Sequence, residues 1–172
     1  MKKLSSLVFL TVLFLIFAHK PVKDYKSVKI GDQIWMAENL DVAAFSNGDP
    51  ISQAISPEEW IRFGRNQEPA WCYYENDKAN RKYGKLYNWY AASDPRGLAP
   101  EGWRVATDED WKKFTEILGG EEVAAKKLKA KEGWFENGNG IDEYGFNVMT
   151  IGGRGNDGKF YLKGKTSAFW TS

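Results

Sequence analysis

The first part of the chain alternates short apolar runs with polar turns, a pattern typical of strands joined by tight connections. Residues 28–40 (VKIGDQIWMAENL) predict a hairpin, because Gly31 supplies the positive φ that a two-residue turn requires. The polar residues 43–56 are expected to form a loop. A short helix should then begin, with Ser56 as its N-cap and Pro57 in its first turn.

The middle of the chain mixes one strand, one ambiguous segment and two helices. Residues 70–74 (AWCYY) are apolar and strand-like, whereas the ring-dense residues 83–92 fit a strand or a helix. Acidic residues follow Thr107, as suits the positive end of a helix. The apolar face of the helix expected there comprises Trp111, Phe114, Ile117 and Leu118. A second helix is expected over residues 121–130, with Val123, Ala124 and Leu128 buried.

Glycine punctuates the remainder of the chain, which predicts short strands and wide turns. Strands are expected over residues 146–151, 159–162 and 168–171, with a loop at 137–140 and a turn at 152–158. A hairpin, then helices, then a run of strands indicates an α+β fold. Two to three helices would flank a mostly antiparallel sheet.

The N-terminus has the pattern of a secretion signal, with Lys2 and Lys3 before an apolar run at residues 7–18. That run is shorter than the roughly 20 residues of a membrane-spanning helix. We therefore expect a signal peptide at residues 1–18, cleaved after Ala18, with an uncleaved anchor as the alternative. A short linker (19–27) and a single domain (28–172) would follow. The protein would be secreted or held in the cell envelope, with no membrane span after cleavage.

Composition excludes several chemistries. The net charge is +1, with cationic and acidic residues interleaved, so no nucleic-acid partner is expected. His19 is the only histidine and Cys72 the only cysteine. A serine or cysteine triad and a histidine-based zinc site are therefore ruled out for the mature domain. A lipoprotein would need a cysteine directly after the signal, so lipid anchoring is not expected. We interpret Cys72 as a buried apolar residue rather than a nucleophile or an intermolecular bridge.

A series of motifs runs almost the whole length of the expected domain. They are IGDQIWMAENL at 30–40, CYY at 72–74, YGKLYNWYAA at 83–92, LAPEGW at 98–103, TDEDW at 107–111, KLK at 127–129 and GF at 145–146. In this order they resemble the Fibrobacter succinogenes major paralogous domain, a family of bacterial extracellular domains. The resemblance implies an α+β fold related to C-type lectins and to formylglycine-generating enzymes.

The chain departs from the family pattern in three places. Ala106 stands where proline is common, and residues 149–151 replace a Leu-Pro-Gly-like turn. Family members also continue past the strand that matches residues 168–172, so the domain is either truncated at its C-terminus or closes with an exposed sheet edge. The catalytic cysteines of formylglycine-generating enzymes lie late in the chain, where this sequence has none. No catalytic residue is therefore predicted, and the chain is not expected to be an enzyme.

Aromatic side chains offer the best route to a function, because their flat faces stack on sugars and anchor interfaces. The chain has 8 Trp, 8 Tyr and 10 Phe. We interpret Trp35, Trp103 and Trp111 as core. The candidate ligand-binding residues are Trp60, Trp71, Trp89 and Trp134.

The segment NGNGIDE at 137–143 could supply oxygen ligands to calcium through Asn137, Asn139 and Asp142, or it could be a plain turn. No other cofactor is expected. The leading hypothesis is a non-catalytic module that binds a surface glycan or an envelope protein. The alternatives are an extracellular enzyme that uses carboxylates on polysaccharide, and a purely structural envelope protein.

Overall fold

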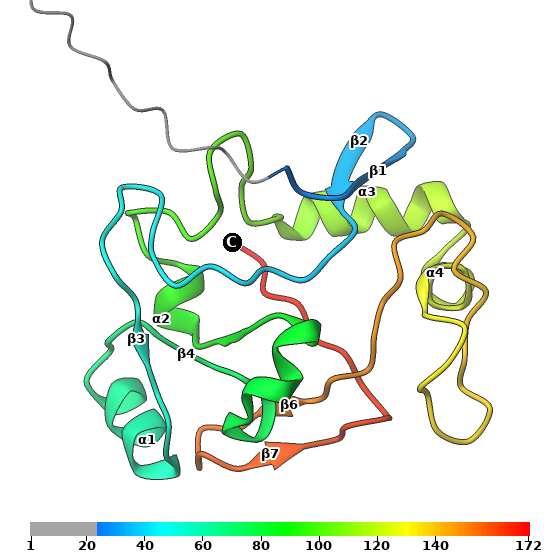
Figure 1. Ribbon diagram of the computed structural model, residues 1–172. Helices are drawn as coiled ribbons and strands as arrows, with labels where there is room; N and C mark the ends of the chain where they lie inside the picture. Colours follow the sequence, from blue (N-terminus) through cyan, green and yellow to red (C-terminus); the bar gives the residue numbers. More distant parts are fainter. Residues whose placement is uncertain (1–23) are drawn as a thin grey trace, which may run out of the picture.

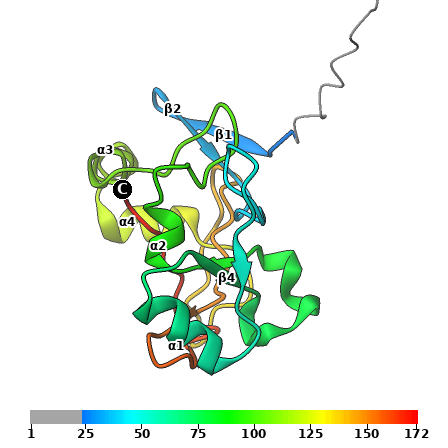
Figure 2. The same ribbon diagram turned by 90° about the vertical axis from the view of Figure 1, so that its left-hand side faces the viewer.

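The computed structural model describes residues 24–172, so the expected signal peptide and the first part of the linker lie outside the described residues. Short strands alternate with helices along this range (Figures 1 and 2). The strands are β1 (Ser27–Ile30), β2 (Gln33–Met36), β3 (Ser52–Gln53), β4 (Ala70–Cys72), β5 (Leu86–Tyr87), β6 (Gly153–Arg154) and β7 (Phe160–Tyr161). The α-helices are α1 (Pro57–Arg65), α2 (Trp89–Ala92), α3 (Asp108–Leu118) and α4 (Glu121–Leu128), and the 3-10 helices are η1 (Tyr74–Asn76) and η2 (Lys78–Tyr83).

The α+β class is confirmed, but the strands form three small sheets in place of one mostly antiparallel sheet. β1 pairs with β2 and β6 with β7, both antiparallel, while β4 pairs in parallel with β3 and antiparallel with β5. The strand expected over 146–151 is wrong, because Asn147 (φ 56°) and Gly152 (φ 68°) turn the chain there. The strand expected over 168–171 is also wrong, because within residues 24–172 this segment makes no backbone hydrogen bond to another segment.

The predicted hairpin is confirmed, with Ile30 opposite Gln33 at the turn. Gly31 has a φ of 62°, as the first residue of a two-residue turn. A side chain there would also collide with α3, since a Cβ would lie 2.7 Å from Cδ1 of Ile117. The turn therefore needs glycine both for its conformation and for its packing against the helix.

The helix starts follow the predicted caps. The Ser56 hydroxyl accepts a hydrogen bond from the backbone N–H of Glu59, whose carboxylate accepts one from the backbone N–H of Ile55 at 2.8 Å. Thr107 and Asp110 form a reciprocal capping box at the start of α3. Burial of Val123 in α4 was wrongly predicted, because this side chain is exposed, although Ala124 and Leu128 are buried as expected. Among the described residues, no helix is long and apolar enough to cross a membrane.

The ambiguous segment 83–92 contains both kinds of structure, with β5 leading into α2 through the buried Asn88. The Asn88 side-chain oxygen accepts hydrogen bonds from the backbone N–H groups of Ala70 and Ala91, both at 3.0 Å. Its amide donates to the carbonyl of Glu68 at 2.8 Å. One buried polar side chain thereby ties β4 to α2, which explains why helix and strand signals meet in this segment.

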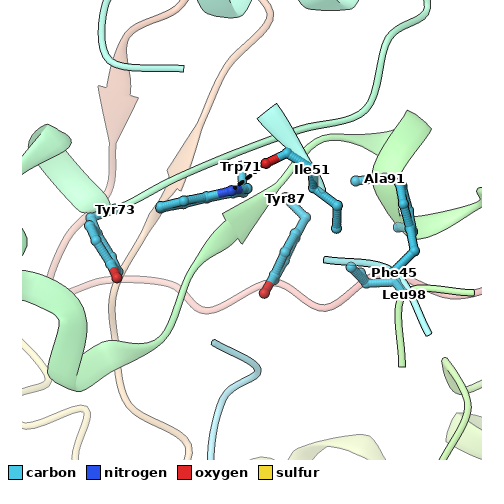
Figure 3. Close-up of a cluster of buried hydrophobic side chains, with 8 residues drawn as sticks. Phe45, Ile51, Trp71, Tyr73, Tyr87, Ala91 and Leu98 are labelled. Carbon is cyan, nitrogen blue, oxygen red and sulfur yellow. Dashed lines mark hydrogen bonds between the residues drawn. The ribbon is translucent and has the colours of Figure 1, made fainter. Parts of the chain in front are cut away.

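Three clusters of buried side chains form the core. One joins the hairpin to α3 and α4 through Ile30, Phe114 and Leu118. A second surrounds β4 and β5, where the Trp71 indole donates to the carbonyl of Ile51 at 2.9 Å (Figure 3). The third places α1 against β4.

Candidate binding groove

A groove of about 790 Å³ lies between the β1–β2 hairpin, the loop before α3 and the last residues of the chain. Its lining extends from Asp32 in the hairpin turn to Trp60 of α1. The hairpin and α1 lie at opposite ends of the molecule in both views (Figures 1 and 2). The volume is within the usual range for ligand sites. Because the lining residues extend from one end of the molecule to the other, the groove suits an elongated ligand.

Aromatic side chains form much of the groove wall near the hairpin. Trp35 packs on Trp111 with ring centroids 4.6 Å apart, and Trp111 packs on Phe169 at 5.2 Å. Trp103 and Trp170 complete this aromatic wall. Trp35 also contacts Phe114 of the core at 4.4 Å. The two indoles of Trp35 and Trp111 therefore belong to the core on one side and to the groove on the other.

Three polar atoms of the wall are buried without a hydrogen-bond partner. They are the side-chain oxygen of Gln33 and the indole nitrogens of Trp35 and Trp111. By contrast, the indole of Trp170 donates to the carbonyl of Tyr87 at 2.8 Å. Buried polar groups are nearly always hydrogen-bonded in folded proteins. Each of these atoms has almost no accessible surface, so they lie behind the face of the wall that borders the groove.

The charged side chains of the groove are already compensated. Arg104 forms a two-pronged ion pair with Asp110, with one contact at 2.7 Å. Hydrogen bonds from Arg104, then from the Thr107 backbone and hydroxyl, hold the pKa of Asp110 far below its usual range. Asp110 is therefore ionised at neutral pH, and in that state it cannot donate a proton.

Lys85, whose side chain is buried, forms an ion pair with Asp41 beneath the groove. The lysine also donates to the backbone carbonyl of Asp41 at 2.7 Å, and its ammonium lies over the rings of Trp71 and Tyr73. Burial acts to raise the pKa of Asp41, but hydrogen bonds from Lys85 and Arg81 outweigh it and lower the pKa. This charge pair holds residues 83–92 against Asp41. Neither side chain is therefore available to a substrate as a free acid or base.

At the opposite end of the groove, Arg154 links the β6–β7 hairpin to α1. Its guanidinium donates to the carbonyls of Ser56 at 2.8 Å, Gly158 at 3.0 Å and Ala54 at 3.2 Å. It also lies over the ring of Trp60 at 4.8 Å. Arg154 is thus a structural clamp that closes this end of the groove.

The structure separates the four tryptophans predicted to bind ligand. Trp60, Trp71 and Trp134 are buried, although part of Trp60 reaches the groove lining. The Trp134 indole donates to the carbonyl of Val148 at 3.2 Å, and its ring lies under the ammonium of Lys129 at 4.1 Å. Only Trp89 is largely exposed, at 45%, and it packs on Trp170.

Trp35, Trp103 and Trp111, interpreted as core from the sequence, are partly buried and line the groove. Trp35 and Trp111 pack against the core cluster of the hairpin and α3 with part of each ring. No local pattern indicates that the other side faces an open groove, because that depends on residues distant along the chain.

Two of the three calcium candidates, Asn139 and Asp142, use a side-chain oxygen within their own loop. Asn139 accepts a hydrogen bond from the backbone N–H of Trp134 at 2.9 Å, and Asp142 accepts one from that of Asn147 at 2.7 Å. Asn137 has a φ of 60°, as in a turn. Within residues 24–172, no group of three or more His, Cys, Asp or Glu side chains is placed to hold a metal ion. The loop geometry thus has a structural explanation that does not require calcium.

Cys72 is buried in the cluster between α1 and β4, and desolvation raises the pKa of its thiol. A thiol in that state is a poor nucleophile. Its position agrees with the interpretation of Cys72 as a buried apolar residue.

Comparison with known proteins identifies one family. The Fibrobacter succinogenes major domain matches residues 28–172, a range that contains α1 to α4 and the groove. No curated protein and no solved structure matches the chain.

Proposed function

The chain belongs to the Fibrobacter succinogenes major domain family, and we propose that it is a non-catalytic binding module that holds an elongated ligand in the aromatic groove. The signal pattern at residues 1–18 supports a site of action outside the cytoplasm or in the cell envelope. Surface glycans and envelope proteins are the partner classes. The observation that carries the proposal is the groove of about 790 Å³, whose lining includes the exposed rings of Phe169 and Trp170.

The state of the titratable groups favours binding over catalysis. Asp41 and Asp110 have lowered pKa values and permanent cationic partners. A general acid for polysaccharide cleavage needs a raised pKa instead. The thiol of Cys72 is buried and protonated at neutral pH. These side chains stabilise the walls of the groove, and the wall itself provides contact area.

As part of this proposal, the α+β fold is a lectin-like one, related to that of formylglycine-generating enzymes. Support comes from the tryptophan-rich segment 102–111, which leads directly into α3. In this arrangement the groove lies beside that segment, between α3 and the C-terminal residues.

The experiment compares two exposed phenylalanines, one in the groove and one outside it. Phe169 is 43% exposed and lines the groove, whereas Phe135 is 59% exposed and does not. Retention of the domain would be measured on cellulose, on xylan, on peptidoglycan and on individual purified envelope proteins, each immobilised on a separate column. Phe169→Ala should weaken retention at least about fivefold, which corresponds to about 1 kcal/mol. Phe135→Ala should leave it unchanged.

Two results would overturn the proposal. One is an absence of retention on every glycan and every envelope protein tested. The other is turnover of a polysaccharide that disappears in Asp110→Asn but persists in Phe169→Ala, since this would assign catalysis to the groove.

A further inference from the structure

We propose that the groove receives an extended polypeptide segment, which pairs as an added strand with the free edge of β2. This inference rests on the proposed binding function and specifies its partner class. The guest would be a strand of another protein with apolar side chains at alternate positions. It would lie between β2 and residues 167–170.

Two extended segments, residues 33–36 and 167–170, border the groove along their backbone edges. All four residues of β2, Gln33–Met36, line it, and so do all four consecutive residues 167–170. Successive side chains of an extended segment point to opposite faces. A cavity facing one side of such a segment would touch alternate residues, whereas a cavity along its edge touches every residue. The groove is therefore bounded by two backbone edges.

Both of these edges have hydrogen-bonding capacity to spare. Among the described residues, β2 belongs to a two-stranded sheet and pairs only with β1. Within the part of the chain that the structure describes, backbone groups of residues 168–171 make no hydrogen bond to other backbone groups or to side chains. Ser172 donates to the carbonyl of Ala106 at 3.0 Å and fixes the end of this segment in place. An added strand offers matching N–H and C=O groups at the spacing that such edges require.

The aromatic wall also suits a strand. Trp111 packs on Trp35 and Phe169, so only part of its ring borders the groove. Apolar side chains of a guest strand can fill the space beside these rings. The same guest would then satisfy the backbone edges and bury the apolar wall.

The test uses a short synthetic peptide of alternating valine and threonine, and a second peptide of the same sequence with alternate backbone nitrogens methylated. The two share their side chains, but the methylated peptide lacks the donors that pair with a strand edge. Binding would be followed by calorimetry on the wild-type domain. We expect the methylated peptide to bind at least about tenfold more weakly, as the loss of one or two hydrogen bonds implies.

Amide hydrogen exchange gives a positional readout on the same complex. Ile30 and Gln33 close the hairpin as a hydrogen-bonded pair, so the next pair, Lys29 and Ile34, is not hydrogen-bonded. The backbone N–H of Ile34 therefore points away from β1. Exchange of Ile34 and Met36 should slow when the peptide is added, whereas exchange of Lys29, on the outer edge of β1, should not change.

A pair of variants tests the same edge by mutation. Ile34→Pro removes the donor on the free edge of β2, and Lys29→Pro removes the donor at the register partner on the opposite edge. Only the first should abolish peptide binding. If either variant unfolds, the methylated peptide and the exchange experiment on the wild-type domain decide the question.

The outcomes separate this inference from the function on which it rests. Equal binding of both peptides, or no protection of Ile34, refutes the added strand. If a polysaccharide then binds and Phe169→Ala weakens it, the binding function stands with a glycan as its ligand. If neither peptides, polysaccharides nor envelope proteins bind, both proposals fail.

Discussion

Removing the two partners of the buried Lys85–Asp41 pair should have unequal effects on stability. Only 4% of the Lys85 side chain is exposed, compared with 18% for Asp41. Asp41→Ala leaves the ammonium buried, with one backbone carbonyl at 2.7 Å and the rings of Trp71 and Tyr73 as its remaining neighbours. Lys85→Met keeps the apolar stem against those rings. It leaves Asp41 paired with Arg81 at 2.9 Å.

The magnitudes follow from these neighbours. Breaking a buried pair so that one charge is stranded costs about 3–5 kcal/mol. The ammonium keeps its backbone carbonyl and both ring contacts, so we expect the low end of this range, and Asp41→Ala should lower the free energy of unfolding by about 3 kcal/mol. Lys85→Met should cost about 1 kcal/mol, because Asp41 keeps an ionic partner and access to water. The difference of about 2 kcal/mol is roughly a thirtyfold change in the folding equilibrium.

Urea unfolding of the two variants and the wild type, followed by circular dichroism, measures both values. The pH dependence gives a second check. The pKa of Asp41 is lowered in the folded protein, so its stabilisation is fully present above the unfolded pKa of about 3.9 and is lost as the pH falls through the folded pKa. The gap between the wild type and Asp41→Ala should therefore close in acid. Equal costs for the two variants at neutral pH, or a larger cost for Lys85→Met, would refute the reasoning.

Three further predictions concern the frame around the groove. Gly152→Ala should lower the free energy of unfolding by more than about 2 kcal/mol in urea titration, because a Cβ at φ 68° would lie 2.8 Å from the backbone nitrogen of Lys163 and would collide with the carbonyl of Tyr161. A free energy of unfolding equal to that of the wild type would contradict this, since it would show that the β6–β7 hairpin can shift to accommodate the Cβ. Thr107→Ala should cost about 1 kcal/mol through loss of the α3 cap, and Thr115→Ala, within the same helix, serves as its control. Cys72 should react with a thiol reagent only after unfolding, since burial raises the pKa of the thiol and covers it; fast reaction in native buffer would contradict this.

Local sequence signals predicted the parts of the fold whose cause is local. The Gly31 turn, the Ser56 and Thr107 caps and the end of α3 at its glycine pair all depend on residues within one turn of each other. The α+β class follows from the order of these elements. Segment 83–92 resisted prediction because its strand and helix share Asn88, which bonds to β4 across the core.

The candidate site was predicted less well, and Trp60 and Trp111 show why. Both lie in helices with apolar neighbours at helical spacing. Trp60 is buried because β4 and Phe160 of β7 pack around its helix. Trp111 packs on Trp35, Phe114 and Phe169, and it still lines the groove. The amount of each ring that stays accessible is therefore decided by residues far away in the sequence.

The sequence by itself determined the family, the α+β class, the helix caps and the hairpin, because motifs, caps and turns are encoded by residues close together in the chain. Only the tertiary structure decided that the strands divide into three small sheets and that residues 168–171 remain unpaired. It also decided that the groove is lined by tryptophans whose spacing indicated core. Strand pairing and exposure are set by contacts between distant segments, and a single sequence pattern does not specify which segments meet.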